Sequence, residues 1–217
     1  MQETIPQIAI WVVPVLAAII FHEVAHGWVA FRLGDPTAAR MGRLTLNPIS
    51  HIDLFGTILM PLFLILVHAP FVFGYAKPVP VNFHNLHHPK RDMIWVAAAG
   101  PLTNILLATA SVYLLKFLSV WGNLLPAFFE TPLALMAQHS IAMNAMLASF
   151  NLLPVPPLDG GRVMVGLLPE PYSSGLARIE RLGFIIILVL LMTHTLDFFM
   201  GPLVYVVTRL IGALVIG

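Results

Sequence analysis

The sequence predicts an all-α polytopic membrane protein, a bundle of about five to six transmembrane or re-entrant helices with a short extended or β segment near its functional site. Of the 217 residues, 59% are hydrophobic and only 10% are charged, whereas soluble domains have about 25% charged residues. The mean hydropathy is +0.89, and long apolar runs alternate with short polar connectors. We expect a single integral membrane domain over residues 1–217.

Charge and cysteine content exclude several classes of function. The formal net charge is +1, which provides no basic surface for a nucleic acid. Because the chain has no cysteine, disulfides and thiolate metal sites are excluded, and a metal must be held by histidine and carboxylate. The N-terminus lacks the basic segment of a signal peptide, so we expect the first apolar run to be a retained span.

The first apolar run, residues 8–31, is about 36 Å long as a helix and can cross a hydrocarbon core of about 30 Å. It contains the motif His22-Glu23-Val24-Ala25-His26. In a helix the two histidines lie one turn apart on one face, as two imidazoles that bind one Zn²⁺ must. Glu23 lies about 100° round the helix, where it reaches a water at the metal and not the metal itself.

The position of this motif argues against a surface helix that happens to carry two histidines. His22, Glu23 and His26 are the only ionisable residues in the apolar run. Ionisable groups at membrane depth are costly, and they mark functional sites by default. The run therefore indicates a zinc site inside the membrane.

The other apolar runs follow from hydropathy and from the positions of proline. A second run covers residues 54–73 and contains Pro61 and Pro70. A third and a fourth cover residues 93–120 and 133–153. The last stretch, residues 182–217, is interrupted around 194–201, and predicts either one helix plus an interfacial helix or a pair of short helices.

Basic residues orient these runs in the membrane. Arg32, Arg40 and Arg43 follow the first run, and Lys90 and Arg91 precede the third. By the positive-inside rule both groups belong on the cytoplasmic side. This requires residues 54–73 to leave and return on that side as a hairpin, which the prolines permit. The alternative is an ordinary span, which would place Lys90 and Arg91 outside.

A catalytic zinc needs a third protein ligand and an open position for water. Asp159 is the best candidate, because the fourth run returns the chain to the level of His22. The segment before it is broken by Pro154, Pro156 and Pro157, and Gly160 and Gly161 follow. The spacing equally permits Asp159 to cap the next helix. His51 and Asp53 are the runner-up ligands, although a turn or a helix cap explains them as well.

Three separated motifs, in order, resemble the site-2 protease family of intramembrane zinc metalloproteases, in its compact bacterial or archaeal form without PDZ or CBS domains. They are the H-E-x-x-H motif, Gly100-Pro101 with Asn104, and the stretch from Asn151 to Asp159-Gly160. The resemblance implies that His22, His26 and Asp159 bind one Zn²⁺ and that Glu23 is the general acid/base. It also implies a prokaryotic plasma membrane, in which the positive-inside argument places the site toward the cytoplasm.

The resemblance further implies an endopeptidase whose substrates are transmembrane helices of single-span membrane proteins, such as membrane-tethered regulators or remnant signal peptides. Asn104 lies in the third run, where its amide could hold the substrate or the oxyanion. The alternative role for Asn104 is an interhelical hydrogen bond, which is common for asparagine in membranes.

Residues 74–82 are spaced by prolines and have extended character. Pro78 and Pro80 block one edge of such a segment and leave the amides of Lys77, Val79 and Val81 on the other. One hypothesis is that this edge clamps unwound substrate by strand addition. The other is a proline-rich loop that covers the site.

Two other functional classes compete with the protease. A metal-binding transporter or channel needs polar groups at several depths, whereas this chain concentrates them at one level. A membrane scaffold without activity does not explain the intact His22, Glu23 and His26. His84, His87 and His88 could form a second metal site, but a solvated polar loop is the simpler interpretation.

Overall fold

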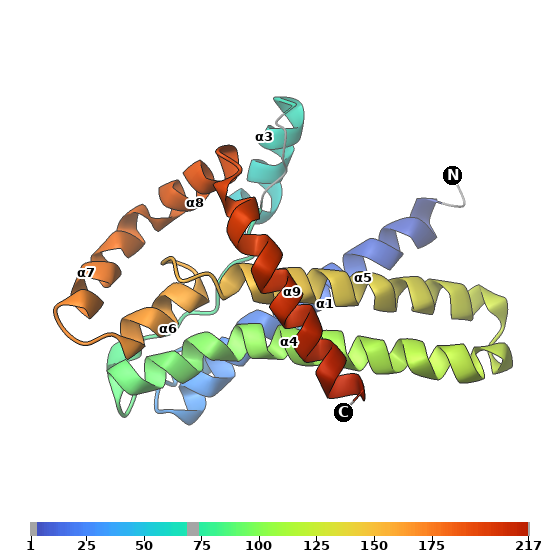
Figure 1. The fold of residues 1–217 in the computed structure, drawn as a ribbon, viewed down its shortest axis with the longest axis horizontal. Helices are drawn as coiled ribbons and strands as arrows, with labels where there is room; N and C mark the ends of the chain where they lie inside the picture. Colours follow the sequence, from blue (N-terminus) through green and yellow to red (C-terminus); the bar gives the residue numbers. More distant parts are fainter. Residues whose placement is uncertain (1–3, 69–73, 217) are drawn as a thin grey trace.

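The computed structural model describes residues 4–68 and 74–216, in which the regular secondary structure is helical and is joined by irregular connections (Figure 1). Four helices are long and apolar enough to cross a membrane. They are α1 (Thr4–Arg32), α4 (Pro89–Trp121), α5 (Ala127–Asn151) and α9 (Thr195–Ile216). The all-helical, multi-pass class is confirmed. The described residues contain four candidate spans, so the expected count of five to six transmembrane or re-entrant helices is not confirmed. The expected β segment does not form within the described residues.

Helix α4 lies at the centre of the bundle and packs against α5, α1 and α6. Figure 1 shows α4 and α5 side by side, with α9 crossing them. Alanines make this contact close: Ala108 of α4 and Ala145 and Ala148 of α5 form one buried cluster with two residues of α9, Val207 and Ile211. Small residues let membrane helices approach, because between lipid-solvated helices packing replaces the hydrophobic effect.

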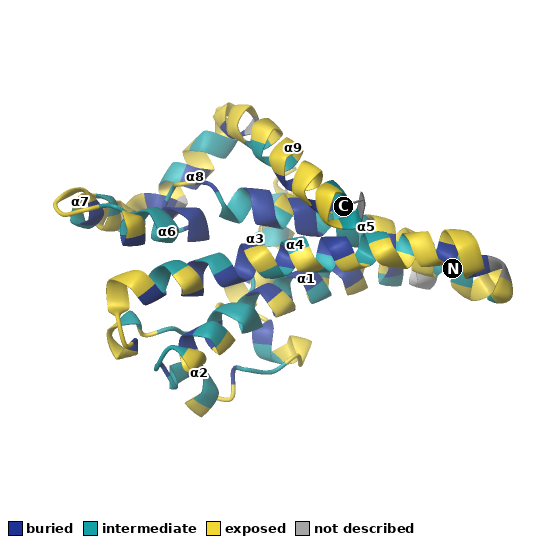
Figure 2. Ribbon diagram, turned by 60° about the horizontal axis from the view of Figure 1, so that its bottom comes forward, coloured by how far each residue is buried: buried dark blue, intermediate teal, exposed yellow. Residues whose placement is uncertain are grey.

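The long helices have exposed outer faces, which Figure 2 shows along α5 and α9, and many of the exposed residues are large and apolar. Phe128 at the start of α5 is 78% exposed, and Phe198 of α9 is 76% exposed. Apolar surface of this extent is rare on soluble monomers. It is the surface expected of helices that are solvated by lipid.

The described part of the second apolar run, residues 54–68, is too short to span a membrane. It forms a π-helical turn, η2 (Leu54–Leu59), followed by α3 (Met60–Leu66), together about 20 Å long and short of the hydrocarbon core of about 30 Å. Beyond the run the chain returns to its beginning: the amide of Tyr75 donates to the carbonyl of Gly56 at 3.1 Å. The two ends are therefore adjacent, as the hairpin prediction requires. Pro70 lies outside the described residues.

The C-terminal part contains three short helices before α9. These are α6 (Asp159–Leu167), α7 (Tyr172–Ile179) and α8 (Gly183–Met192). The chain turns between α8 and α9 at His194, whose φ is 55°. The predicted interruption is present but narrower than expected. Of the two predicted arrangements, one long helix with a second, shorter helix agrees with α9 and α8, and a pair of short helices does not.

The remaining elements are single turns that shape the connections. They are α2 (Thr37–Arg40), η1 (Pro48–His51), η3 (Phe83–Asn85), η4 (Gly122–Leu124) and η5 (Glu180–Leu182).

Candidate metal centre

Three side chains from α1 and α6 converge on one point. Nε2 of His22 and Nε2 of His26 lie 3.2 and 3.3 Å from Oδ2 of Asp159. The two Nε2 atoms are 3.0 Å apart. Within residues 4–68 and 74–216 these are the residues whose ligand atoms are grouped closely enough to hold a metal ion. The fourth run thus returns Asp159 to the level of His22, as the topology argument predicted.

The spacing of these atoms fits a tetrahedral zinc. Zinc–ligand bonds of about 2.0–2.1 Å at tetrahedral angles place ligand atoms about 3.3 Å apart. Oδ2 of Asp159 is buried and has no hydrogen-bond partner in the described structure. A buried carboxylate oxygen without a partner is costly, and a cation between it and the two imidazoles removes that cost. The donor set of two histidines and one carboxylate also suits Zn²⁺.

Gly100 of α4 forms the wall behind the two histidines. A Cβ atom at this position would lie 2.4 Å from Nε2 of His26 and 2.5 Å from Cε1 of His22. Real Cβ contacts are never this short, so only glycine lets α4 pass the imidazoles. Gly100 therefore allows the close helix approach that was expected, and the groups that α4 approaches there are the two histidines of α1.

Asp159 does not cap α6. It is the first residue of that helix, the N-cap residue is Leu158, and no side chain makes a capping hydrogen bond there. Two glycines allow the turn that aims Asp159 at α1. A Cβ at Gly160 would lie 2.3 Å from the carbonyl oxygen of Leu152, and one at Gly161 would lie 2.2 Å from the nitrogen of Pro156. Of the two roles that the spacing permitted, this geometry favours the ligand.

The runner-up ligands have other partners. Asp53 caps η2, because its Oδ1 accepts from the amide of Gly56 at 2.7 Å. Nε2 of His51 hydrogen-bonds the carbonyl of Thr45 at 2.8 Å. His84, His87 and His88 contribute to no metal-ligand group in the part of the chain that the structure describes.

The other ring nitrogen of each histidine, Nδ1, donates a hydrogen bond to a fixed acceptor. Nδ1 of His26 lies 2.6 Å from the carbonyl oxygen of Val96, and Nδ1 of His22 lies 2.7 Å from Oδ1 of Asn104. A carbonyl can only accept, so His26 carries its proton on Nδ1 and its Nε2 lone pair faces the centre. Such outer contacts fix the tautomer and the orientation of metal-binding histidines.

The orientation of Asn104 is fixed by neighbours that can only accept. Its Nδ2 donates to the carbonyl of Ala18 at 3.1 Å and to Oδ1 of Asn144 at 2.8 Å. Asn144 in turn donates to the carbonyl of Ser140 at 2.8 Å. Oδ1 of Asn104 must therefore face His22, which makes His22 Nδ1 the donor. Asn104 and Asn144 are 0% and 1% exposed, so this chain of hydrogen bonds is sealed between α1, α4 and α5.

This geometry favours a different role for Asn104 from the expected contact with substrate or oxyanion. Its two amide hydrogens are already donated, and its oxygen supports His22. The alternative, an interhelical hydrogen bond, is what the structure contains. We therefore propose Asn104 as a positioning residue for His22, supported by Asn144, a residue that the sequence analysis did not single out. An asparagine within the apolar residues of 133–153 was the available signal.

Substitution of Asn104 separates these two roles. Asn104→Leu removes the acceptor from His22 and is expected to weaken zinc binding about 10- to 100-fold. Asn104→Asp keeps an acceptor for His22 and is expected to bind zinc more tightly than Asn104→Leu. Competition with a chromophoric zinc chelator measures both affinities. Equal zinc affinity in Asn104→Leu and the wild type would contradict the positioning role.

Glu23 does not touch the three converging atoms but is held by the loop that crosses α1. Its Oε2 accepts from the amide of Val79 at 2.9 Å. Val79 packs on the helix beside it, since a Cβ at Gly27 would lie 2.5 Å from Cγ1 of Val79. One carboxylate oxygen of Glu23 is thus fixed by the backbone, which orients the other.

Residues 74–82 have no regular secondary structure and are tied down at both ends. Near the start, the amide of Lys77 donates to the carbonyl of His51 at 2.9 Å, and Nη2 of Arg43 donates to the carbonyl of Lys77 at 2.9 Å. The amides of Lys77 and Val79 are therefore paired within the chain and not free for an added strand. The structure contains the alternative, a proline-rich loop beside the site.

Asp35 anchors the other end of this loop. It is fully buried, and its carboxylate accepts from the amide of Asn82 at 2.7 Å and from Nδ2 of Asn85 at 2.9 Å. Burial alone raises the pKa of a carboxyl group, but the hydrogen bonds from Thr37, Asn85 and Asn82 hold the pKa of Asp35 below its usual range. The charged form is thus retained as the anchor.

Comparison with known proteins decides the family. The model of peptidase family M50 matches residues 122–194, which include Asp159. The zinc metalloprotease YwhC of Bacillus subtilis is 40% identical over 192 residues, which cover 88% of this chain and 84% of that protein. The chain belongs to peptidase family M50. The M50 peptidase is also 31% identical to the zinc metalloprotease Rip2 of Mycolicibacterium smegmatis, over 88% of this chain and 69% of the relative.

A more distant relative is the zinc metalloprotease MJ0392 of Methanocaldococcus jannaschii, which is 21% identical over 76% of this chain and 36% of that protein. No solved structure matches the chain. Membership of family M50 confirms the resemblance to the site-2 proteases. The M50 peptidase is a zinc metalloprotease, and its apolar helices make it a multi-pass membrane protein.

Proposed function

We propose that this M50 peptidase is an intramembrane endopeptidase that hydrolyses peptide bonds within the transmembrane segments of single-span membrane proteins. Membrane-tethered regulators and remnant signal peptides are the substrate classes that fit. His22, His26 and Asp159 hold the zinc, and Glu23 is the general acid/base. Residues 1–217 act as one integral membrane domain.

One observation carries this proposal. His22, Glu23 and His26 lie within a helix, residues Ile8–Arg32, that is long and apolar enough to cross a membrane. The third converging side chain, on Asp159, is also buried. A peptide bond that meets these groups must enter at the same depth, which favours a membrane-embedded substrate over a soluble one.

The chemistry follows from the positions of the protein groups. When bound, zinc lowers the pKa of a coordinated water and polarises a carbonyl. Glu23, with one oxygen held by Val79, accepts the proton of the attacking water through its other oxygen. It then passes that proton to the leaving amine. Because a helical carbonyl is already hydrogen-bonded, the substrate must be unwound where it is cut.

A transporter is not favoured by the same arrangement. An ion path needs polar groups at successive depths, and the ionisable residues of α1 between Ile8 and Phe31 are confined to His22, Glu23 and His26. The hydrogen bonds beyond them, through Asn104 and Asn144, are made by neutral amides that are fully paired.

The proposed orientation places the site toward the cytoplasmic side of a prokaryotic plasma membrane. Lys77 in the loop beside the site and Lys90 at the start of α4 are both exposed, and in this orientation they face the cytoplasm. The chain has no cysteine, so single Lys77→Cys and Lys90→Cys variants give a clean background for labelling. An impermeant maleimide added to intact cells is expected to label neither, and to label both after lysis. Labelling of either variant in intact cells would contradict this orientation.

The substrate class is tested by co-reconstituting the zinc-loaded protein in liposomes with a single-span reporter protein. We expect cleavage that a chelator stops, with new termini inside the transmembrane segment when mapped by mass spectrometry. Termini only in the soluble parts of the reporter would contradict an intramembrane endopeptidase.

A further inference from the structure

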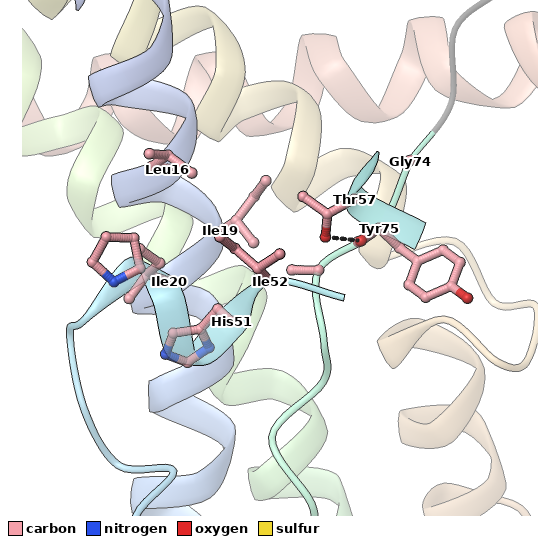
Figure 3. Close-up of a pocket in the computed structure, with 10 residues that line it drawn as sticks. Leu16, Ile19, Ile20, His51, Ile52, Thr57, Gly74 and Tyr75 are labelled. Atoms are coloured by element: carbon pink, nitrogen blue, oxygen red, sulfur yellow. Dashed lines mark hydrogen bonds between the residues drawn. The ribbon is translucent and has the colours of Figure 1, made fainter. Parts of the chain in front are cut away.

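A cavity of about 220 Å³ opens beside α1, one helical turn from Glu23 (Figure 3). Leu16, Ile19 and Ile20 of α1 form one wall. Residues from 48–52 and from 74–76, together with Thr57, form the others. The side chains that line it are mostly apolar, and nothing in the described chain fills it.

The cavity and the catalytic carboxylate belong to one surface of α1. Residues at spacings of three, four and seven share a helix face, so Leu16, Ile19, Ile20 and Glu23 form one stripe. The opposite wall is continuous as well. Gly74, Tyr75 and Ala76 line the cavity, and the same loop continues to Val79, whose amide holds Glu23. The two segments that enclose the cavity are therefore the two that meet at Glu23.

The walls of the cavity are held in place by contacts of the residues that form them and of their neighbours. Thr57 donates its hydroxyl to the carbonyl of Tyr75 at 2.9 Å, the dashed contact in Figure 3. The ring of Tyr75 covers Gly56, where a Cβ would lie 2.4 Å from the ring. The ring points away from α1 in Figure 3 and leaves the cavity open. The carbonyl of His51 also accepts a hydrogen bond from the amide of Lys77, which fixes the wall formed by residues 48–52 against the loop.

We propose that this cavity, between the Leu16–Ile19–Ile20 face of α1 and residues 74–76, receives one apolar side chain of the unwound substrate, within about three residues of the cut bond. This inference rests on the proposed function. The cavity is smaller than sites of about 300–1,000 Å³ for small molecules. It exceeds the cavity of about 150 Å³ that holds benzene in an engineered core. One aliphatic or phenyl side chain fits this volume, and an indole, the largest apolar side chain, is the one whose fit depends most on the position of the walls.

A side chain bound here fixes the register of the cut. A transmembrane segment consists largely of similar apolar residues, and an unwound stretch could slide past Glu23. Two residues of extended chain span about 6.6–6.8 Å, comparable to one helical turn of α1 at about 5.4 Å. Anchoring one side chain beside Ile19 therefore presents a defined carbonyl to Glu23. The cavity thus selects both the size of the anchored residue and the bond that is cut.

The test uses pairs of transmembrane peptides that differ only by Leu or Trp at one of the three positions on either side of the cut. Each pair is digested together by the zinc-loaded protein, and mass spectrometry gives the ratio of the two cleavage rates. At one position the wild type is expected to favour Leu about tenfold or more, the range for one methylene or more in an apolar pocket. Ile19→Ala enlarges the cavity and is expected to bring that ratio to about one or to reverse it.

Phe21→Ala is the matched control, because Phe21 is exposed on the opposite face of the same helix. It is expected to leave every Leu/Trp ratio at the wild-type value. Ile52→Ala removes apolar volume from another wall and is expected to repeat the effect of Ile19→Ala, so the test does not depend on one variant folding. Ratios that stay unchanged in both wall variants overturn the pocket.

The outcomes separate this inference from the proposed function. One outcome is cleavage that depends on Glu23 but whose side-chain preferences are the same in the wild type and in both wall variants. This outcome would contradict the proposed pocket and would leave the proposed protease function intact. A cavity occupied only by lipid or detergent gives that same result. Failure of the wild type to cut any peptide within its transmembrane segment would contradict both the pocket and the proposed function.

Discussion

Glu23→Gln is expected to lower the rate of peptide cleavage by at least about a hundredfold while zinc binding is retained. General acid–base catalysis contributes about 10²- to 10⁴-fold, and an amide has no basic oxygen with which to take a proton from water. The metal is expected to stay, because Glu23 is not among the three converging side chains. Glutamine keeps an oxygen that accepts from Val79, so the loop contact persists.

Cleavage of a synthetic transmembrane peptide in detergent with added zinc measures this effect. Zinc content by elemental analysis, at about one per chain in both proteins, is the control for the fold. Activity within about tenfold of the wild type would remove Glu23 from the proton transfer. Loss of zinc together with activity would instead make Glu23 part of the metal site.

Gly100→Ala is expected to abolish zinc binding, and activity with it. The new Cβ would lie 2.4 Å from Nε2 of His26 and 2.5 Å from Cε1 of His22. Those imidazoles cannot withdraw, because Asn104 and the carbonyl of Val96 hold their other nitrogens. The clash is therefore relieved only by moving α4 or by turning the rings away from the metal.

Gly212→Ala in α9 is the matched control, since a Cβ there meets no atom within 4 Å. It is expected to keep zinc at the wild-type level, which shows that adding a methyl group to a membrane helix is tolerated. Zinc content is measured after dialysis against a weak chelator. A Gly100→Ala protein that holds zinc as the wild type does would contradict the packing of α4 on the histidines.

The residues of the metal centre could be predicted from the sequence, whereas the contacts of the loop of residues 74–82 could not. Residues four apart on a helix share a face whatever surrounds them, so His22 and His26 could be paired from spacing alone. Asp159 could be predicted to lie at the same membrane depth, because the third apolar run is long enough to cross the membrane and the fourth to return. The hairpin at residues 54–73 followed from the positions of basic residues, and the return contact of Tyr75 on Gly56 agrees with it.

The partners of residues 74–82 could not be predicted, because they come from distant parts of the chain. Alternate prolines gave these residues the pattern of a free strand edge. In the structure, the amide of Lys77 meets His51 and that of Val79 meets Glu23. The choice between the two roles of Asn104 could not be made from the sequence for the same reason: the direction of its amide is set by Ala18 and Asn144, which lie on other helices. Tertiary hydrogen bonds of this kind leave no periodic signal.

The central claim is that Asp159 completes the zinc site with His22 and His26, and the zinc content of Asp159→Asn tests it most directly. Asparagine has nearly the same shape but no charge, and a neutral amide is a poor ligand for zinc. Asp53→Asn is the matched control, because Asp53 caps a helical turn and asparagine caps equally well. We predict about one zinc per chain in the wild type and in Asp53→Asn, and far less in Asp159→Asn after dialysis. Zinc near one per chain in Asp159→Asn, with full activity, would contradict the account.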